Sequence, residues 1–347
     1  MQRVYLDYNA TSPLRAEARS AMIDAMDAMG NPSSVHAEGR AAKAIIERAR
    51  AQISEAIGAS GADIVFTSSA TEAAALALKG RGLLGAAIEH DAVRAYIAPS
   101  LHVSRGGEVR VAEPEKSALQ LANSETGVMQ ELPSGLAVSD FTQAFGKVPV
   151  SFAWSGVDMA LISAHKLGGP KGVGALILRQ GSDVEALIRG GGQEMGRRSG
   201  TENVIGIAGF GAAAAAAQRD LETGVWSRVE EFRNILEISL EGFAEPIIFV
   251  GKGSQRLPNT SCFIAPGWKG ETQVMQMDLA GFAVSAGSAC SSGKAKASGV
   301  LTAMGFDEAQ AGSAIRVSIG PATTEEDIKR FAETWASKYE KIRAKAA

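Results

Sequence analysis

The chain has 347 residues, of which 46% are hydrophobic and 21% charged, with a formal net charge of −3. These proportions argue against wholesale disorder, and the length allows two domains. Scattered Lys and Arg form no basic face for nucleic acid, no apolar run reaches the roughly 20 residues of a membrane span, and the N-terminus does not resemble a signal peptide.

Helix-like and strand-like patterns alternate over the first 245 residues. Apolar residues three or four apart predict helices near 20–30 and 45–57, and "DIVFTSS" predicts a buried strand that leads into a helix beginning near Thr71. The segments "ALQLANSETG", "VDMALISAHK" and "GGPKGVGALIL" predict further buried strands. Strands separated by helices indicate a mostly parallel sheet covered on both faces.

The pattern changes near residue 245. "EPIIFVGKGSQRLPNTSCFIAPG" predicts two strands joined by a turn, and "GSAIRVSIGPATTEEDIKRF" predicts a strand, a turn and a terminal helix. Thr323 and Glu326 have the spacing of a capping box at the start of that helix. We therefore expect an α+β second domain, in which Cys262 lies on a strand as a buried, unreactive thiol.

The chain has two cysteines and four histidines, whose number and spacing bear on its compartment and on metal binding. Two cysteines without a secretion signal favour the reducing cytoplasm, and histidines scattered along the chain predict no metal site. We therefore expect a cytoplasmic protein with no metal, no membrane and no direct nucleic-acid partner.

Lys166 directly follows the strand predicted in "VDMALISAHK" and precedes several glycines. A lysine held at a strand end, away from bulk water, can have a lowered pKa and form a Schiff base. A surface lysine after a strand is an equally good interpretation of this spacing.

Four other polar residues fit a phosphate-bearing cofactor near that lysine, although each has an ordinary structural interpretation. Thr71 begins a predicted helix, where free backbone N–H groups bind phosphate or the residue acts as an N-cap. Asp140, three residues before Gln143, could pair with a pyridinium nitrogen or be a turn residue. His90 follows a short apolar run and could stack on an aromatic ring or be structural.

Arg316 lies in the predicted strand "AIRVSIG". Because Ile315, Val317 and Ile319 share one face of that strand, Arg316 and Ser318 share the other. An arginine there can hold a carboxylate with two parallel hydrogen bonds, while a surface ion pair on a half-exposed strand is the alternative.

Cys290 lies in "SAGSACSSG", among small polar residues and glycines. A structural cysteine normally packs among large apolar residues, and a disulfide needs a partner. The segment therefore favours a reactive thiol, in surroundings that allow it to move. Because a free thiol with a pKa near ~8.5 is mostly protonated at neutral pH, its deprotonation must be assisted.

Eleven segments, in order and over nearly the whole chain, resemble the cysteine desulfurases of the class V aminotransferase-like family, which use pyridoxal 5'-phosphate (PLP). They are "YLDYNATSP", "GNPSSVHAEGR", "TSSATEAAALALKG", "EHDAV", "ANSETGVMQ", "DFTQAFGK", "SAHKLGGPKGVGAL", "GGGQEMGRRSGTEN", "LPNTSCF", "SAGSACSSG" and "IRVSIGPATTEED". The stretch between "TSSATE" and "DFTQ" is shorter than in typical members, which leaves little room for the usual helices.

The resemblance implies a PLP-dependent transferase of fold type I, an α/β protein. We expect a large PLP-binding domain at 13–245, with a mostly parallel, seven-stranded-type sheet. A smaller α+β domain, formed by 1–12 and 246–347, carries the active-site cysteine loop. The resemblance also implies a homodimer.

The activity implied is conversion of L-cysteine to L-alanine, with the sulfur passing as a Cys290 persulfide to an acceptor protein. The segment around Cys290 resembles the active-site segment of the subgroup that serves iron–sulfur cluster assembly and tRNA thiolation. Three alternatives stay open: a selenocysteine lyase, another PLP-dependent β-lyase, and a non-catalytic sulfur-relay or scaffold protein that has kept the fold.

Four residues take catalytic or ring-binding roles by this resemblance. Lys166 would bind the cofactor covalently and move the Cα proton of the substrate. Asp140 would pair with the pyridine nitrogen and Gln143 with the ring hydroxyl, while His90 would stack on the ring and assist proton transfer.

The remaining roles concern the phosphate and the substrate. Thr201 would contact the PLP of the neighbouring subunit, Asn123 and Arg316 would hold the substrate carboxylate region, and Cys290 would be the nucleophile. The phosphate would be bound by Ala70, Thr71, Ser163 and His165.

Overall fold

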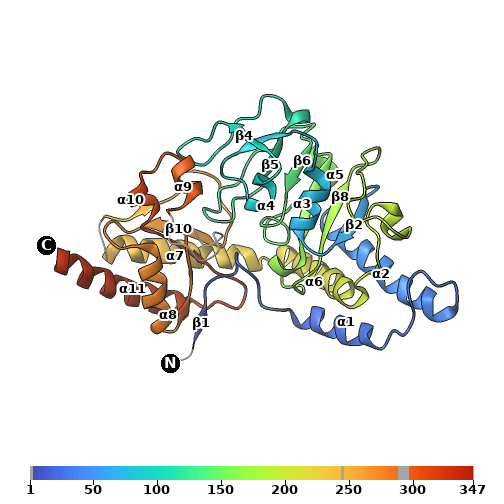
Figure 1. The fold of residues 1–347 in the computed structure, drawn as a ribbon. Helices are drawn as coiled ribbons and strands as arrows, with labels where there is room; N and C mark the ends of the chain where they lie inside the picture. The colour runs from blue at the N-terminus through green and yellow to red at the C-terminus, as the bar shows by residue number, and fades with distance from the viewer. Residues whose placement is uncertain (1–2, 244–245, 288–296, 347) are drawn as a thin grey trace.

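The computed structural model describes residues 3–243, 246–287 and 297–346. Figure 1 shows two packed parts, with the first about 220 residues forming most of one and the C-terminal helices gathered in the other. The elements up to residue 222 are β1 (Val4–Tyr5), α1 (Ala16–Met26), α2 (Ala37–Ala56), β2 (Asp63–Thr67), α3 (Ala70–Leu78), β3 (Leu84–Ala86), α4 (Asp91–Arg94), β4 (Ala98–Leu101), η1 (Pro114–Lys116), β5 (Ala118–Gln120), β6 (Val138–Asp140), α5 (Phe152–Ser155), β7 (Met159–Ser163), η2 (Ala164–Lys166), β8 (Gly174–Leu178), η3 (Gln193–Gly196) and α6 (Val204–Glu222). The later elements are α7 (Val225–Phe243), β9 (Ile248–Phe249), β10 (Thr260–Ile264), α8 (Gly270–Leu279), β11 (Phe282–Ala283), β12 (Ser285–Ala286), α9 (Gly299–Ala303), α10 (Glu308–Ala311), β13 (Ala314–Ser318) and α11 (Glu325–Ala346).

The central sheet has the strand order β2-β8-β7-β6-β5. Strands β5, β6 and β7 run parallel, whereas β8 is antiparallel to both β2 and β7. The parallel pair β3–β4 joins the β5 side through a single bridge between Leu84 and Ser117. The predicted α/β sheet is confirmed, and β8 is its antiparallel strand.

Helices cover both faces of this sheet, as the alternating pattern predicts. On one face, α2 and α6 pack closely because small residues line their contact: a Cβ added at Gly211 would lie 2.6 Å from Ala49 Cα. On the other face, α3 contributes its alanines to a core with the buried side chains of β7 and β8. Small side chains therefore set the distance between layers.

The second part is built on an antiparallel sheet of order β12-β13-β10-β9. Its core is aromatic, with Trp335 edge-on to Phe263 and Trp268 stacked on Tyr339. These residues come from α11, β10 and the loop after it, so the amphipathic pattern predicted for the terminal helix is confirmed.

The cap of α11 differs from the predicted one. Thr324 Oγ1 accepts from Asp327 N at 3.2 Å, and Asp327 Oδ2 accepts from Thr324 N at 3.1 Å. The predicted cap residue Thr323 instead accepts from Gly320 N. The capping pair therefore lies one residue later, because Thr323 is used by the turn that precedes the helix.

The N-terminal segment lies with the second part. β1 pairs in parallel with β11, and Asp7 forms a parallel bridge with Ser318. Helix α7 also packs in the aromatic core, against α11. The division into 13–245 and 1–12 with 246–347 stays a prediction, and the packing of α7 indicates that this core begins before residue 245.

The shortened stretch between α3 and α5 contains little helix. Among its described residues, α4 has four residues and η1 has three. Over all described residues, no helix is long and apolar enough to span a membrane.

Candidate active site

Three neighbouring strands bring the predicted phosphate-binding residues to one edge of the sheet. Gly174, at the start of β8, pairs with Thr67 at the end of β2 and with Ser163 at the end of β7. A Cβ at Gly174 would lie 2.5 Å from Ser69 C and 2.8 Å from Ala70 N, so only glycine lets the start of α3 approach the sheet this closely.

The first turn of α3 therefore lies beside the end of β7. Ser69, and not Thr71, caps the helix by accepting from Glu72 N, so the N-cap interpretation of Thr71 is wrong. Thr71 is exposed in the first turn. The first N–H groups of a helix have no intrahelical acceptor and attract anions. This edge can accommodate a phosphate.

His165 lies next to this edge and is uncharged at neutral pH. Burial, and then the positive charges of Lys166, Lys171 and Lys147, lower its pKa to about 4. Its Nδ1 lies 3.2 Å from Thr11 Oγ1. A neutral imidazole contributes a hydrogen bond to an anion without adding a full charge.

Lys166 ends η2, directly after β7, where the sequence places it. Its Nζ donates to Asn9 O at 2.7 Å and to Ala10 O at 2.9 Å, while its own carbonyl accepts from Ser12 Oγ. The N-terminal segment thus positions this lysine.

Asp140 and Gln143 lie at the same ends of the parallel strands. Asp140 is the last residue of β6, and its Oδ1 accepts from Thr142 N at 2.8 Å. Gln143 is buried, donating from Nε2 to Asn9 O at 3.0 Å and accepting at Oε1 from Lys147 Nζ at 2.7 Å. The expected contact of Gln143 with a ring hydroxyl stays a prediction.

His90 and Glu89 belong to the neighbouring loop. His90 caps α4 by accepting from Ala92 N at 3.1 Å, and its side chain is exposed. Glu89 is buried, and its Oε1 accepts from Gln120 N at 3.0 Å. Burial, with a smaller contribution from Asp140, raises the pKa of Glu89 to about 8.

Arg316 is more buried than the sequence indicated. β13 is buried on both faces rather than half-exposed, because α7 and the N-terminal segment cover it. Arg316 Nη2 donates to Asp7 Oδ1 at 2.7 Å and Nη1 donates to Ser124 O at 3.1 Å. Its ion pair is therefore internal, and the surface-pair interpretation is wrong. The shared face with Ser318 is confirmed, since Ser318 Oγ accepts from Asn9 N.

Asn123 organises a loop beside Arg316. Its Oδ1 accepts from Glu125 N and Thr126 N, and its Nδ2 donates to Ile88 O at 3.0 Å. These bonds join the loop after β5 to the segment before His90. A contact of Asn123 with substrate stays a prediction.

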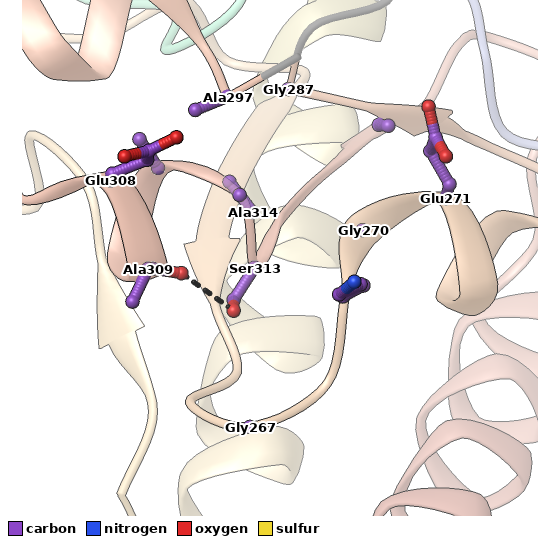
Figure 2. A pocket seen from close by; sticks show the side chains of 13 residues that line it. Gly267, Gly270, Glu271, Gly287, Ala297, Glu308, Ala309, Ser313 and Ala314 are labelled. Carbon is purple, nitrogen blue, oxygen red and sulfur yellow. Dashed lines mark hydrogen bonds between the residues drawn. The ribbon is translucent and has the colours of Figure 1, made fainter. Parts of the chain in front are cut away.

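Two predicted residues remain, Thr201 and Cys290. Thr201 is exposed and lines a cavity of about 230 Å³ with Ser68 and Arg198, so its role across a subunit boundary stays a prediction. Cys290 lies outside the described residues. Its described neighbours Gly287 and Ala297 both line a cavity of about 650 Å³ (Figure 2).

The other cysteine matches its prediction. Cys262 is buried in β10, and burial raises the pKa of its thiol well above the usual range. Within the described part of the chain, no group of three or more His, Cys, Asp or Glu could hold a metal ion.

Sequence reasoning missed Asn9, Lys147 and Glu89. Asn9 binds partners from both parts of the chain, including Lys147, Asn259 and Thr260. The apolar residues around Lys147 in "AFGKVPV" were the only local signal that this lysine is buried. Nothing in the local sequence marks Asn9 or Glu89.

Comparison with known proteins shows the family of the chain. The Aminotransferase class-V family model matches residues 4–116 and 113–331. The cysteine desulfurase IscS of Dictyoglomus turgidum is 36% identical over 378 residues, covering 99% of this chain and 96% of its own. A cysteine desulfurase of Cereibacter sphaeroides is 38% identical, covering 99% of this chain and 97% of its own.

Solved structures show the same fold. A NifS-like protein from Rickettsia africae superposes with a TM-score of 0.88 at 32% identity, covering 98% of this chain and 100% of that one. The protein SspA, solved in complex with cysteine, superposes with a TM-score of 0.75 at 28% identity, covering 92% of this chain and 99% of that one.

Proposed function

Because this chain belongs to the class V aminotransferase family and, within it, to the cysteine desulfurases, we propose that it takes the sulfur atom from L-cysteine with the help of PLP bound at Lys166. One observation carries the proposal: Lys166, Asp140 and the first turn of α3 lie at or just after the ends of strands β7, β6 and β2 of one sheet. These residues offer an amine, a carboxylate and an anion site.

The residues present fit PLP. The close approach of α3 at Gly174 brings the first N–H groups of the helix and Thr71 to the ends of β2 and β7, where the neutral His165 follows β7. Ala70 and Ser163 complete the proposed phosphate site. When bound, PLP supplies a conjugated ring that stores the electron pair released at the substrate Cα.

The chain's own residues handle the proton and the ring charge. Lys166 Nζ takes the proton from the substrate Cα and returns it, which requires its amine form. The Asp140 carboxylate would balance the positive pyridine nitrogen, and Gln143 would contact the ring hydroxyl. His90, on an exposed loop, would stack on the ring and assist proton transfer.

Arg316 and Asn123 orient the substrate. The Nε of Arg316 has no hydrogen-bond partner among the described residues although it is buried, so its N–H can be offered to a carboxylate. Asp7 and Ser124 hold the other two nitrogens, which fixes the plane of the guanidinium. The substrate is thereby held by its carboxylate, with its sulfur free to react.

Cys290 takes the sulfur. Its thiol and L-cysteine become a Cys290 persulfide and L-alanine: the bond between Cβ and sulfur breaks, a sulfur–sulfur bond forms, and a proton completes the alanine methyl group. The persulfide then passes its outer sulfur to an acceptor.

The partners and location are further parts of the proposal. We infer a cytoplasmic homodimer in which Thr201 contacts the partner's PLP, and an acceptor protein that serves iron–sulfur cluster assembly or tRNA thiolation. The near full-length similarity to IscS-type desulfurases supports this assignment.

The test is alanine released from L-cysteine by the purified protein with PLP and a reductant, beside Cys290→Ser and Lys166→Ala. We expect alanine from the parent protein and almost none from either variant. Equal alanine from parent and Cys290→Ser would remove the thiol from the reaction, and none from the parent would contradict the proposed activity.

A further inference from the structure

Lys147 is a fully buried lysine whose partners are neutral. Its side chain is 1% exposed, and its Nζ donates to Gln143 Oε1 at 2.7 Å and to Asn9 Oδ1 at 2.9 Å. Among the described residues no carboxylate pairs with it. Burial, and then the charges of Lys166 and Arg316, lower the pKa of Lys147 well below its usual range.

The two hydrogen bonds decide how both amides are turned. An amide has an acceptor oxygen and a donor nitrogen, and only the oxygen can face the N–H groups of a lysine. Gln143 and Asn9 must therefore present their oxygens to Lys147. If either amide flipped, the hydrogen bond that Lys147 Nζ donates to its oxygen would be lost, and a buried N–H of the lysine would lose its acceptor.

The rest of the network agrees with this orientation. Gln143 Nε2 donates to Asn9 O at 3.0 Å, and Asn9 Nδ2 donates to Thr260 Oγ1 at 2.9 Å. Asn9 O also accepts from Lys166 Nζ at 2.7 Å. A continuous set of hydrogen bonds thus leads from Lys147 through Gln143 and Asn9 to Lys166.

One N–H of Gln143 remains after these bonds are made. An amide nitrogen carries two hydrogens, and Asn9 O accepts one of them. We propose that Lys147 is a positioning residue, which turns the Gln143 amide so that this second N–H, and never the oxygen, is offered to the ring oxygen of PLP. The inference rests on the proposed function, because it assumes PLP at Lys166.

The proposal predicts a change in acidity at the nitrogen that joins Lys166 to PLP. A donor to the negatively charged ring oxygen stabilises that charge and so weakens the oxygen's hold on the nearby proton. Without the donor, the proton is held more tightly and the pKa of the nitrogen rises. The visible absorbance of the holoenzyme reports this protonation without turnover.

The experiment is a pH titration of that absorbance in the parent protein and four variants. We expect Lys147→Met, which keeps length but donates nothing, to raise the titration midpoint by about one pH unit. Gln143→Leu should raise it similarly, and adding Lys147→Met to Gln143→Leu should add almost nothing, because Lys147 acts through Gln143. Lys116→Met, at an exposed lysine paired with Glu113, serves as the charge-removal control and should leave the midpoint in place.

Two results would overturn the inference. One is an unchanged midpoint in Lys147→Met, and the other is an equal shift in the presence and absence of Gln143. If Lys147→Met fails to fold, Gln143→Glu decides, because Lys147 keeps an oxygen partner while the donor to PLP is lost. An unchanged midpoint in Gln143→Glu contradicts the proposed orientation.

The titration also separates this inference from the proposed function. A parent protein that gains no visible absorbance with PLP contradicts the cofactor assignment. If the parent shows the band and releases alanine, and Gln143→Leu shifts the midpoint but Lys147→Met does not, only the role of Lys147 is contradicted.

Discussion

Arg316 and Asp7 form an ion pair inside the protein, with Nη2 of the arginine 2.7 Å from Oδ1 of the aspartate. The arginine comes from β13 and the aspartate from the N-terminal segment, 309 residues away. Ser285 Oγ also donates to Asp7 Oδ1. The guanidinium is therefore held by several elements, as expected for a group that must meet a substrate in one orientation.

Arg316→Lys is expected to raise the KM for L-cysteine by about tenfold or more, because a single ammonium nitrogen cannot replace three guanidinium nitrogens at separate positions, two of which bind Asp7 and Ser124. Steady-state alanine formation measures KM and kcat separately. An unchanged KM would show that another group binds the substrate carboxylate.

Gly174→Ala is expected to weaken PLP binding about tenfold and to destabilise the fold by about 1–3 kcal/mol, because the new Cβ displaces the start of α3 from the sheet. PLP affinity is measured by equilibrium titration of the apoprotein, and stability by chemical denaturation. Gly242→Ala, in α7 with open space around it, is the matched control and should leave PLP affinity unchanged. Equal affinities in all three proteins would contradict the phosphate site.

Glu89→Gln is expected to change how stability depends on pH. The pKa of Glu89 is raised to about 8 in the folded protein, so the native state holds a proton that the unfolded state loses above about pH 4.5. The stabilisation from this proton is fully present below pH 4.5 and is lost as pH rises through about 8, at most about 4–5 kcal/mol in all.

The variant is neutral at every pH, so its stability relative to the parent should increase steadily between about pH 5 and 8. Denaturation curves at several pH values measure this difference, with the exposed Glu55→Gln as control. Parallel pH profiles for parent and Glu89→Gln would show that Glu89 is ionised when folded.

Glu237→Gln is expected to destabilise the protein by about 3 kcal/mol, because it leaves a buried cation without its counter-charge. Glu237 accepts from both terminal nitrogens of Arg256, at 2.8 and 3.0 Å, and from Ser261 Oγ at 2.8 Å. Glu241 lies on α7 like Glu237, and it forms an exposed ion pair with Lys252. Glu241→Gln removes that pair and should lower the free energy of unfolding by less than about 1 kcal/mol. Similar decreases in the free energy of unfolding for both variants would contradict the prediction that the buried pair contributes more than the exposed one.

Local sequence patterns were sufficient to predict the position of single helices and strands. The strand before Thr71, the strand that ends before Lys166 and the amphipathic α11 all lie where period and turn residues predict them. The cap of α11 shifted by one residue because Thr323 bonds to Gly320, a contact that sequence spacing does not reveal.

Burial of β13 shows a different limit of sequence reasoning. Alternation in "AIRVSIG" correctly placed Arg316 and Ser318 on one face, but alternation normally means that the polar face meets solvent. Here Asp7 and Asn9 cover that face, so its polar groups are satisfied inside the protein. Whether a polar face is exposed depends on a segment more than 300 residues away.

The sequence by itself determined the layered α/β plan, the family and the chemical types at the site, because these follow from local periodicity and from motifs within single segments. The tertiary structure alone decided which of those groups meet. Asn9 and Lys147 are 138 residues apart, yet their hydrogen bond orients the amide beside Lys166. Such contacts arise when strands and the N-terminal segment pack together, and no local pattern encodes the burial that gives Glu89, Lys147 and Arg316 their properties.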